Sequence, residues 1–390
     1  MPGVFAPLFA LSVVVAAIAE PALGQVSADR FEQMPARSIG PVGTIGRISA
    51  IDAVVSDPNV VYVGAATGGL WKSVNGGQTW RSVFDDQSVS AVATVAINQT
   101  KPEILWIGIG AGGGNNDDDD EAPMVATVYR SLDGGETWAL RGLEGLEGVH
   151  RILLHPEDTE IAYAGVSGRT WQAEGDRGGG VYKTSDGGET WTRVLVVDNI
   201  TGVSDLVMDP SDPNRLLAAM WSNRRAPWSF ESRGPGSGLF LTLDGGDNWM
   251  RLGEGDGVPS GDLGRISLDV FRGDPRVVHA LVDAGEGVLL RSYNGGRTWT
   301  TVRRSPNLIS PIDDPAGIVA DPLAESRLFH LSSRLSVSDD GGETFRPNGG
   351  GADLRHRVLW IHPEDPRLMY GGTDRGLYLS RDGGEHWSRM

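Results

Sequence analysis

One eight-residue motif recurs seven times in this chain of 390 residues and restricts its fold more than any other feature. Each copy begins with Ser or Thr, carries Asp or Asn third, has Gly-Gly next, and ends on Trp or Phe. The copies span residues 73–80, 131–138, 184–191, 242–249, 292–299, 338–345 and 380–387. Their first residues are 58, 53, 58, 50, 46 and 42 positions apart. Self-similarity at such a period indicates an architecture built from one small structural unit per copy.

The residues around each copy predict four short strands. In the first unit, apolar runs at 48–55 and 60–64 flank a polar turn that contains Pro, and a third run at 69–72 precedes the motif. A fourth run follows it at 81–83. Four antiparallel strands, here named A to D in chain order, form one blade of a β-propeller. The sequence therefore predicts an all-β, seven-bladed β-propeller over residues 36–390, with the motif as the turn between strands C and D.

The chemistry of the motif suits a tight turn. Gly-Gly permits positive φ, and the Asp or Asn side-chain oxygen can accept hydrogen bonds from nearby backbone N–H groups. The aromatic residue that ends the motif can bury its ring between neighbouring sheets. Because the turn recurs in every blade, we interpret these Asp residues as structural and not as catalytic groups or metal ligands.

The N-terminus has the pattern of an export signal. Residues 4–19 are apolar, and the small residues Ala22 and Gly24 come just before Gln25. This is the hydrophobic region and cleavage site of a secretory signal peptide, although residues 1–6 carry no Lys or Arg. A membrane anchor is the alternative. We expect a signal peptide over 1–25, a linker over 26–35, a secreted or periplasmic protein, and no membrane insertion after signal removal.

Charge and composition exclude several classes of partner. The net charge of −17 argues against nucleic acid, because nucleic-acid binders concentrate Lys and Arg on their surface. The absence of Cys excludes disulfides, thiol nucleophiles and Cys-ligated zinc. The acidic run Asp117–Glu121 could ligate Ca²⁺, but adjacent acids are more often a solvated loop, and no other cofactor or metal site is expected.

The motif and its surroundings resemble those of the Asp-box, or bacterial neuraminidase repeat, superfamily. The residues that carry the resemblance are Arg37–Pro41, Gly46–Ile48, Thr67–Ser73, Gly179–Thr184, Ala218–Trp228 and Gly234–Leu239. This superfamily includes sialidases, xyloglucanase-type glycoside hydrolases, sortilin-type receptors and a photosystem assembly factor. The resemblance is strongest to secreted bacterial sortilin-like proteins named as glycosyl hydrolases with this repeat, and it implies a propeller without specifying an activity.

Two departures from that family affect the expectations. Its members usually continue into a second propeller-like region, whereas this sequence stops at Met390. A Gly-Asp-x-His stretch of the family is replaced here by Ala352–His356, which places any site that used it in doubt.

A candidate site is predicted at one mouth of the central channel. The D–A and B–C loops share the face opposite the motif turns, and Arg47, Arg151 and Arg265 each open a strand A there. Long B–C loops are expected at 109–126, 167–180 and 221–237. The wall that they form would carry the side chains of Trp171, Trp221, Arg224, Arg225 and Trp228. We predict that the wall and the Arg residues bind an anionic or carbohydrate-like ligand. In the alternative, the Arg residues pair with strand-end carboxylates and the Trp residues are loop cores.

Two classes of function remain open. The preferred one is an exported binding or assembly module for a protein, peptide or glycan, and the alternative is a glycoside hydrolase on the same scaffold. A sialidase-like use of the Arg residues would also need a Tyr nucleophile and a paired acid, which the sequence does not identify. A glycosidase with two carboxylates could draw on Asp205, Asp262 and Asp374, which the sequence cannot pair.

The last blade raises the question of how the ring closes. Its fourth strand is limited to residues 386–389, so we expect residues 36–39 to pair there and join the two ends of the chain.

Overall fold

A computed structural model describes residues 46–110, 127–168, 178–226, 229–309, 316–348 and 355–390. All of them belong to one compact unit, Ile39–Met390, and the second unit, Met1–Ser38, lies outside the described residues, as do the expected signal peptide and linker. Within the described ranges, no helix is long and apolar enough to cross a membrane.

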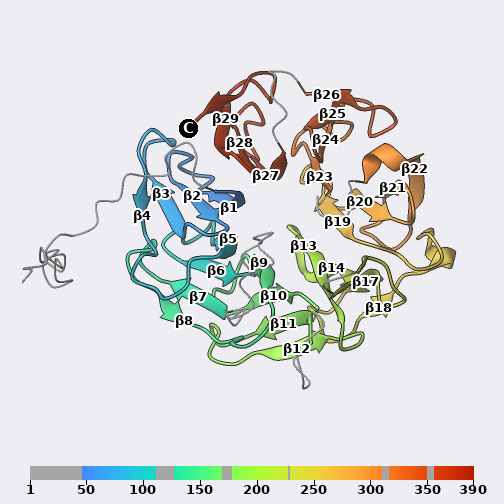
Figure 1. Ribbon diagram of the computed structural model, residues 1–390, viewed down its shortest axis with the longest axis horizontal. Helices are drawn as coiled ribbons and strands as arrows, with labels where there is room; N and C mark the ends of the chain where they lie inside the picture. Colours follow the sequence, from blue (N-terminus) through green and yellow to red (C-terminus); the bar gives the residue numbers. More distant parts are fainter. Residues whose placement is uncertain (1–45, 111–126, 169–177, 227–228, 310–315, 349–354) are drawn as a thin grey trace, which may run out of the picture. The chain divides into compact units, whose positions relative to one another are not determined.

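Seven four-stranded antiparallel sheets surround a central axis, which confirms the seven-bladed propeller (Figure 1). The first four blades are β1–β4 (Ile48–Ala53, Val61–Ala65, Leu70–Ser73, Arg81–Ser82), β5–β8 (Val92–Ile97, Leu105–Ile109, Thr127–Ser131, Ala139–Leu140), β9–β12 (Val149–Leu154, Ala162–Val166, Gly180–Thr184, Thr192–Leu195), and β13, β14, β17 and β18 (Thr201–Asp209, Asp212–Ser222, Gly238–Thr242, Met250–Arg251). The last three are β19–β22 (Ile266–Val270, Val278–Asp283, Gly287–Ser292, Thr300–Ser305), β23–β26 (Gly317–Ala320, Leu328–Leu331, Ser336–Ser338, Arg346–Pro347) and β27–β30 (His356–Ile361, Met369–Thr373, Gly376–Ser380, Ser388–Arg389).

Among the described residues, one hairpin and two 3₁₀ turns lie outside the blades. The hairpin β15–β16 (Arg224–Ala226 and Ser229–Glu231) is inserted between the second and third strands of blade 4. Two 3₁₀ turns, η2 (Glu254–Asp256) and η3 (Pro306–Leu308), precede strand A of blades 5 and 6.

The hydrophobic core is divided into seven clusters, one between each pair of neighbouring blades. Each cluster includes the aromatic residue of one motif copy as a packed or partly buried member: Trp80, Trp138, Trp191, Trp249, Trp299, Phe345 and Trp387. These rings therefore pack between neighbouring sheets as expected; Trp299 is buried and the other six are half-buried.

The motif turns have the predicted hydrogen bonds. In the third copy, the Asp186 carboxylate accepts bonds from the Thr190 backbone N–H at 2.9 Å and from the hydroxyls of Thr184 and Thr190 at 2.7 and 2.6 Å. These bonds, led by the one from the Thr190 hydroxyl, lower the pKa of Asp186 to about 2. Gly187 and Gly188 have φ of 71° and 90°, where residues other than glycine are strained. The Asp186 carboxylate is thus held by the turn.

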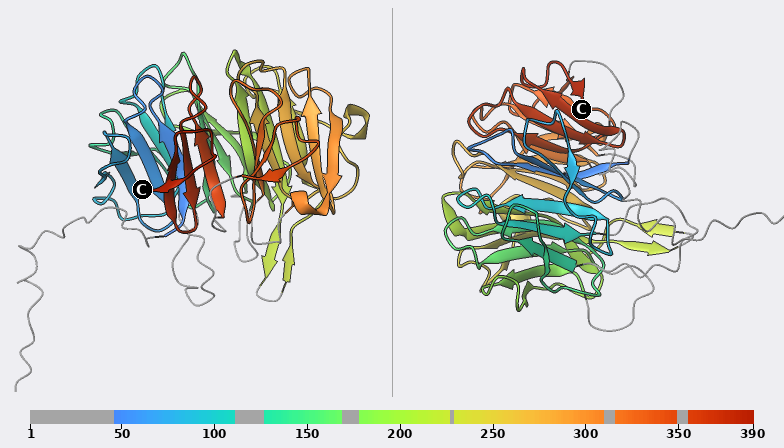
Figure 2. Two further views of the ribbon diagram at one scale, coloured as in Figure 1. Left: turned by 90° about the horizontal axis from the view of Figure 1, so that it is seen from above. Right: turned by 90° about the vertical axis from the view of Figure 1, so that its left-hand side faces the viewer.

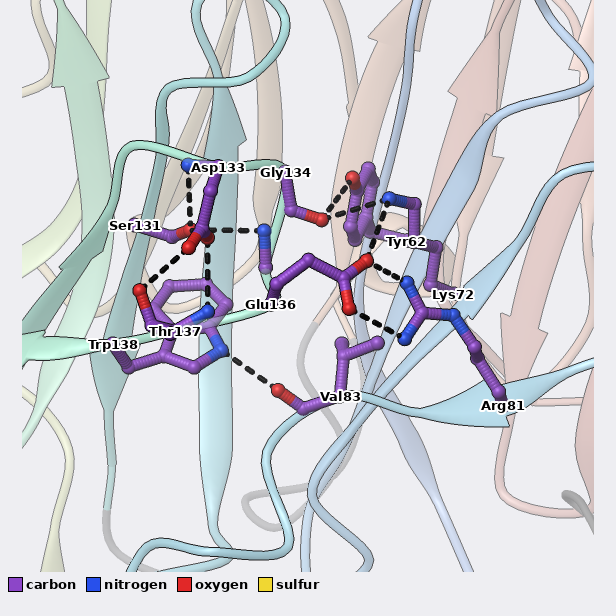
Figure 3. Close-up of polar contacts among 11 residues, drawn as sticks. Tyr62, Lys72, Arg81, Val83, Ser131, Asp133, Gly134, Glu136, Thr137 and Trp138 are labelled. Carbon is purple, nitrogen blue, oxygen red and sulfur yellow. Dashed lines mark hydrogen bonds and ion pairs between the residues drawn. The ribbon is translucent and has the colours of Figure 1, made fainter.

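Several of these turns also tie their blade to the preceding one, as Figure 3 shows for blades 1 and 2. The Tyr62 hydroxyl and the Lys72 ammonium both donate to the Gly134 carbonyl at 2.8 Å. The Trp138 indole N–H donates to the Val83 carbonyl at 2.7 Å. The turn therefore connects two sheets as well as two strands.

Blade 7 has the short fourth strand that the sequence indicated within residues 386–389. It has a fourth strand of its own, β30, which pairs with β29 through Tyr378–Arg389 and Leu379–Ser388. This strand has two residues, as have β4, β8, β18 and β26. The expected partner segment, residues 36–39, lies outside the described residues.

The ring closes through packing between blades 7 and 1. Ile48, Val61 and Val63 share a buried cluster with Tyr370 and Leu377, and β27 lies beside β1 in Figure 1.

Candidate functional site at the channel mouth

Strand A of five blades carries a β-bulge at the same place. It lies four residues before the strand A residue whose partner on strand B also pairs with the motif Ser or Thr. A bulge adds one unpaired residue and turns its side chain to a new direction. The extra residues are Ser49, Ala93, His150, Ser204 and Arg357, and all five line the central cavity. The bulges thus supply part of the wall of the channel.

The cavity has a volume of about 610 Å³, and strand A of every blade contributes to its wall. Arg47, Arg151 and Arg265, which come from blades 1, 3 and 5, all line it. The structure therefore brings together the three Arg residues that the sequence placed at one mouth.

Arg151 follows the alternative in which a channel arginine pairs with a carboxylate. Its Nε lies 2.9 Å from Asp205 Oδ1 in the next blade. Asp205 also accepts the backbone N–H of Leu206 and Leu268, each at 2.9 Å, and the Ser267 hydroxyl at 3.3 Å. The carboxylate of Asp205 therefore joins blades 3, 4 and 5.

Arg357 is a fourth channel arginine that the sequence analysis missed. It binds Asp374 through two contacts of 2.8 and 3.1 Å. A signal for it existed, because His356-Arg357-Val358-Leu359 repeats the pattern His150-Arg151-Ile152-Leu153. Both segments lead into a His-Pro-Glu-Asp turn, but the second is one residue longer, so Arg357 takes the bulge position of His150 and not the position of Arg151.

Arg265 stacks on an aromatic ring. Its guanidinium lies 5.6 Å from the centre of the Trp221 ring, within the range of a cation–π contact. The Trp221 indole N–H donates to the Ser232 carbonyl at 2.8 Å, and its ring meets Phe230 edge-on at 6.3 Å. Half-buried Trp221 thus packs against the inserted hairpin, as the loop-core alternative predicted for it.

The hairpin β15–β16 projects from one face of the ring (Figure 2). Its base is fixed by a β-bridge between Gly234 and Leu263 of the neighbouring blade and by an ion pair of 2.9 Å between Arg233 and Asp283. Arg251 also donates to the Pro235 carbonyl at 2.7 Å. The hairpin therefore forms a wall anchored beside the channel mouth.

The side chain of His150 lines the central cavity, where it is accessible to solvent but surrounded by the strands of the channel wall. Desolvation inside the channel, and then the positive charge of Arg265, lower the pKa of His150 to about 4. The imidazole is therefore neutral at pH 7.

The remaining predicted residues are placed as follows. Trp171 and Trp228 lie outside the described residues, as does the acidic run Asp117–Glu121. The backbones of Arg224 and Arg225 form β15 and pair with Glu231 and Phe230. In the described part of the chain, no group of three or more His, Asp or Glu side chains is arranged to hold a metal ion.

The three carboxylates considered for catalysis differ in their surroundings. Asp205 and Asp374 are both ion-paired with channel arginines. Asp262 is exposed, and its neighbour Leu263 is the bridge partner of Gly234 at the base of the hairpin.

Comparison with known proteins identifies relatives of two kinds. A family model described as Sortilin-Vps10, "Sortilin, neurotensin receptor 3", matches residues 126–257. A xyloglucanase from a Paenibacillus species is 28% identical over 247 residues, which is 58% of this chain and 22% of that protein. An oligoxyloglucan-reducing end-specific xyloglucanase from Emericella nidulans is 24% identical over 391 residues, which is 83% of this chain and 46% of that protein. The chain spans less than half of the length of these relatives.

Solved structures share the fold. The GH74 xyloglucanase from Xanthomonas campestris superposes with a TM-score of 0.65 at 16% identity, over 90% of this chain and 55% of that one. YCF48 bound to D1 peptide superposes with a TM-score of 0.57 at 16% identity, over 86% of this chain and 93% of that one. These findings confirm that the chain is a β-propeller similar to sortilin-type proteins and to xyloglucanases.

Proposed function

We propose that this chain is a glycoside hydrolase-type propeller that acts on a xyloglucan-like polysaccharide at the channel mouth. The observation that carries the proposal is the 28% identity to a xyloglucanase over 247 residues. The relatives thus favour the alternative in the sequence analysis over the preferred binding module. The expected export through residues 1–25 agrees with a polysaccharide substrate outside the cell.

The shape of the surface around the channel mouth favours an extended ligand that lies across this face of the propeller. The β15–β16 hairpin forms one wall, and Trp221 and Arg265 lie at its foot next to the cavity. Apolar and aromatic surfaces with a few fixed polar groups are what extended ligands bind. We therefore place the polysaccharide alongside the hairpin.

Hydrolysis of a glycosidic bond uses two carboxyl groups, roughly 5 to 10 Å apart. Asp205 and Asp374 are engaged by Arg151 and Arg357, so neither offers an oxygen without an existing partner to a leaving group. Asp262 is exposed at the base of the hairpin and is our candidate for one of the two groups.

The test is a hydrolysis assay on purified chain spanning residues 26–390. Xyloglucan is the substrate, starch is the control polysaccharide, and new reducing ends are measured. We expect release from xyloglucan alone, and at least a hundredfold loss of rate in Asp262→Asn. Asp274→Asn is the matched control, because Asp274 is ion-paired to Arg276 in an A–B turn and should leave the rate unchanged.

Three results are decisive. Release of reducing ends by Asp262→Asn at the wild-type rate would remove Asp262 from the proposal but leave the activity. No release and no binding of xyloglucan in affinity electrophoresis would contradict the proposed function. Binding without release would favour the second candidate.

That second candidate is the binding module for a peptide, protein or glycan. It is favoured because two of the three candidate catalytic carboxylates, Asp205 and Asp374, already form ion pairs with arginines of the channel. A propeller of matching size, YCF48, binds D1 peptide, and this chain covers 93% of it.

A further inference from the structure

The charge of the channel mouth opposes the charge of the chain. The sequence carries a net charge of −17, yet four arginines line one cavity: Arg47, Arg151, Arg265 and Arg357. Two carboxylates, Asp205 and Asp374, pair with two of these arginines. A third carboxylate, Asp269, also lines the cavity, so four guanidinium groups face three carboxylates, and the mouth keeps an excess of positive charge in an acidic protein.

This concentration of positive charge is unfavourable by itself. Burial, and next the charge of Arg357, lower the pKa of Arg47 below its usual range. Burial also lowers the pKa of Arg265; the Asp205 carboxylate opposes this effect in part, and Arg357 adds to it. Like charges repel strongly where little water separates them, so an anion among these groups would relieve the repulsion.

Arg265 lies within the electrostatic reach of Asp205 but makes no direct ion pair with it. Among the described residues, no carboxylate forms an ion pair with it, and its guanidinium lies over the Trp221 ring. A neutral side chain could fill the same space against Trp221. Contacts between blades 4 and 5 are made by other groups, such as Asp205 with Leu268 and the Ser204 hydroxyl with the Ile266 carbonyl at 2.8 Å.

We propose that the channel mouth binds a compact oxyanion, a carboxylate or a phosphate, between Arg47, Arg265 and Arg357. A guanidinium group offers paired N–H donors that match the oxygens of either anion. His150, on the same wall, supplies a neutral hydrogen-bonding group. The cavity of about 610 Å³ admits a ligand of the size of a sugar acid. This site does not depend on polysaccharide hydrolysis.

Isothermal titration calorimetry on chain 26–390 tests the proposal with glucuronate, citrate and inorganic phosphate. Glucose is the uncharged match for glucuronate. We expect at least one anion to bind with Kd below about 1 mM, which corresponds to about 4 kcal/mol. We expect glucose not to bind, and the affinity to fall as salt is raised. The anion that binds with the highest affinity shows whether the site prefers a carboxylate or a phosphate.

Variants locate the binding. Arg265→Gln should weaken anion binding at least tenfold without changing Tm by more than a few degrees, since Arg265 makes no ion pair among the described residues. Arg276→Gln removes an exposed arginine of the ring, paired with Asp274, and should bind as the wild type does. If Arg265→Gln fails to fold, Arg47→Gln provides the same comparison.

His150 gives an independent readout by NMR. An anion beside the arginines should raise the pKa of His150 from its depressed value, because it would offset the field of Arg265. The proposal is overturned if no anion binds, if Arg265→Gln and Arg276→Gln weaken binding equally, or if bound anion leaves the titration of His150 unchanged.

Discussion

Two groups of aspartates in the described residues have opposite pKa shifts. In the motif turns, hydrogen bonds donated within the turn lower the pKa of Asp186 to about 2. On strands A of blades 1 and 5, burial raises the pKa of Asp52 and Asp269 to about 6. Each of these two accepts a backbone N–H of the next blade, from Ile97 at 2.9 Å and from Ala320 at 2.7 Å. Position in the blade therefore decides the chemistry of the same side chain.

These shifts predict an optimum in stability at mildly acidic pH. Turn aspartates have pKa values lowered on folding, so their contribution is lost as pH falls from about 4 to about 2. Asp52 and Asp269 have raised values, so the folded state holds their protons more tightly and loses stability as pH rises from about 4 to about 7. We expect urea unfolding to show a maximum near pH 4 to 5 and a fall of about 2 to 5 kcal/mol by pH 7.

A double variant, Asp52→Asn with Asp269→Asn, is the control for this profile. It removes both titrating groups and should flatten the fall between pH 5 and pH 7. A fall of wild-type size in the double variant would assign the effect to other groups.

At the scale of the element, each motif turn is held by a small set of hydrogen bonds from fixed positions of the motif. Its Ser or Thr hydroxyl accepts the N–H of the second Gly, as Thr184 does from Gly188 at 2.9 Å. The Asp at its third position has a natural substitute within the chain. In the first copy, the Asn75 amide oxygen accepts the Thr79 N–H at 2.9 Å, and its NH₂ donates to the Thr79 hydroxyl at 2.8 Å.

This comparison predicts the effect of two substitutions at Asp186. Asp186→Ala leaves the N–H of Thr190 without its partner in the turn and should lower the stability of the protein. Asp186→Asn should lower it less than Asp186→Ala does, because Asn75 already occupies this position in blade 1. Denaturant unfolding at pH 7 measures both; equal losses would show that the amide cannot replace the carboxylate here.

For the whole molecule, the critical step is the contact between the last and the first blade. Tyr370 is fully buried there, in a cluster with Ile51 and Val63. Every other interface joins blades that follow one another in the chain, whereas this one joins the two ends of the described propeller. Loss of this interface would open the ring.

Tyr370→Ala should therefore destabilise the protein strongly. A cavity from a large buried aromatic costs about 3 to 5 kcal/mol, and we expect a corresponding fall in Tm in calorimetry. Leu323→Ala is the control, since Leu323 is 59% exposed and its loss should change stability by less than about 0.5 kcal/mol. A Tm of Tyr370→Ala within two degrees of the control would mean that the ring does not depend on this cluster.

The number of blades and the form of their turns were determined by the sequence itself. Each motif copy contains, within eight residues, the glycines, the acceptor oxygen and the aromatic ring that its turn requires, so no distant contact is needed to recognise it. The three arginines that open strands A were found in the same way, because strand starts of different blades meet at one mouth.

Only the tertiary structure decided which side chains meet in the channel. The bulges at His150 and Arg357 depend on strand register, which is set by pairing with strands B and not by the local sequence. The ion pair of Arg151 joins it to Asp205, 54 residues away, in another blade. Charge neutralisation in the mouth, and hence which arginine remains for a ligand, follows from contacts between blades that no single repeat contains.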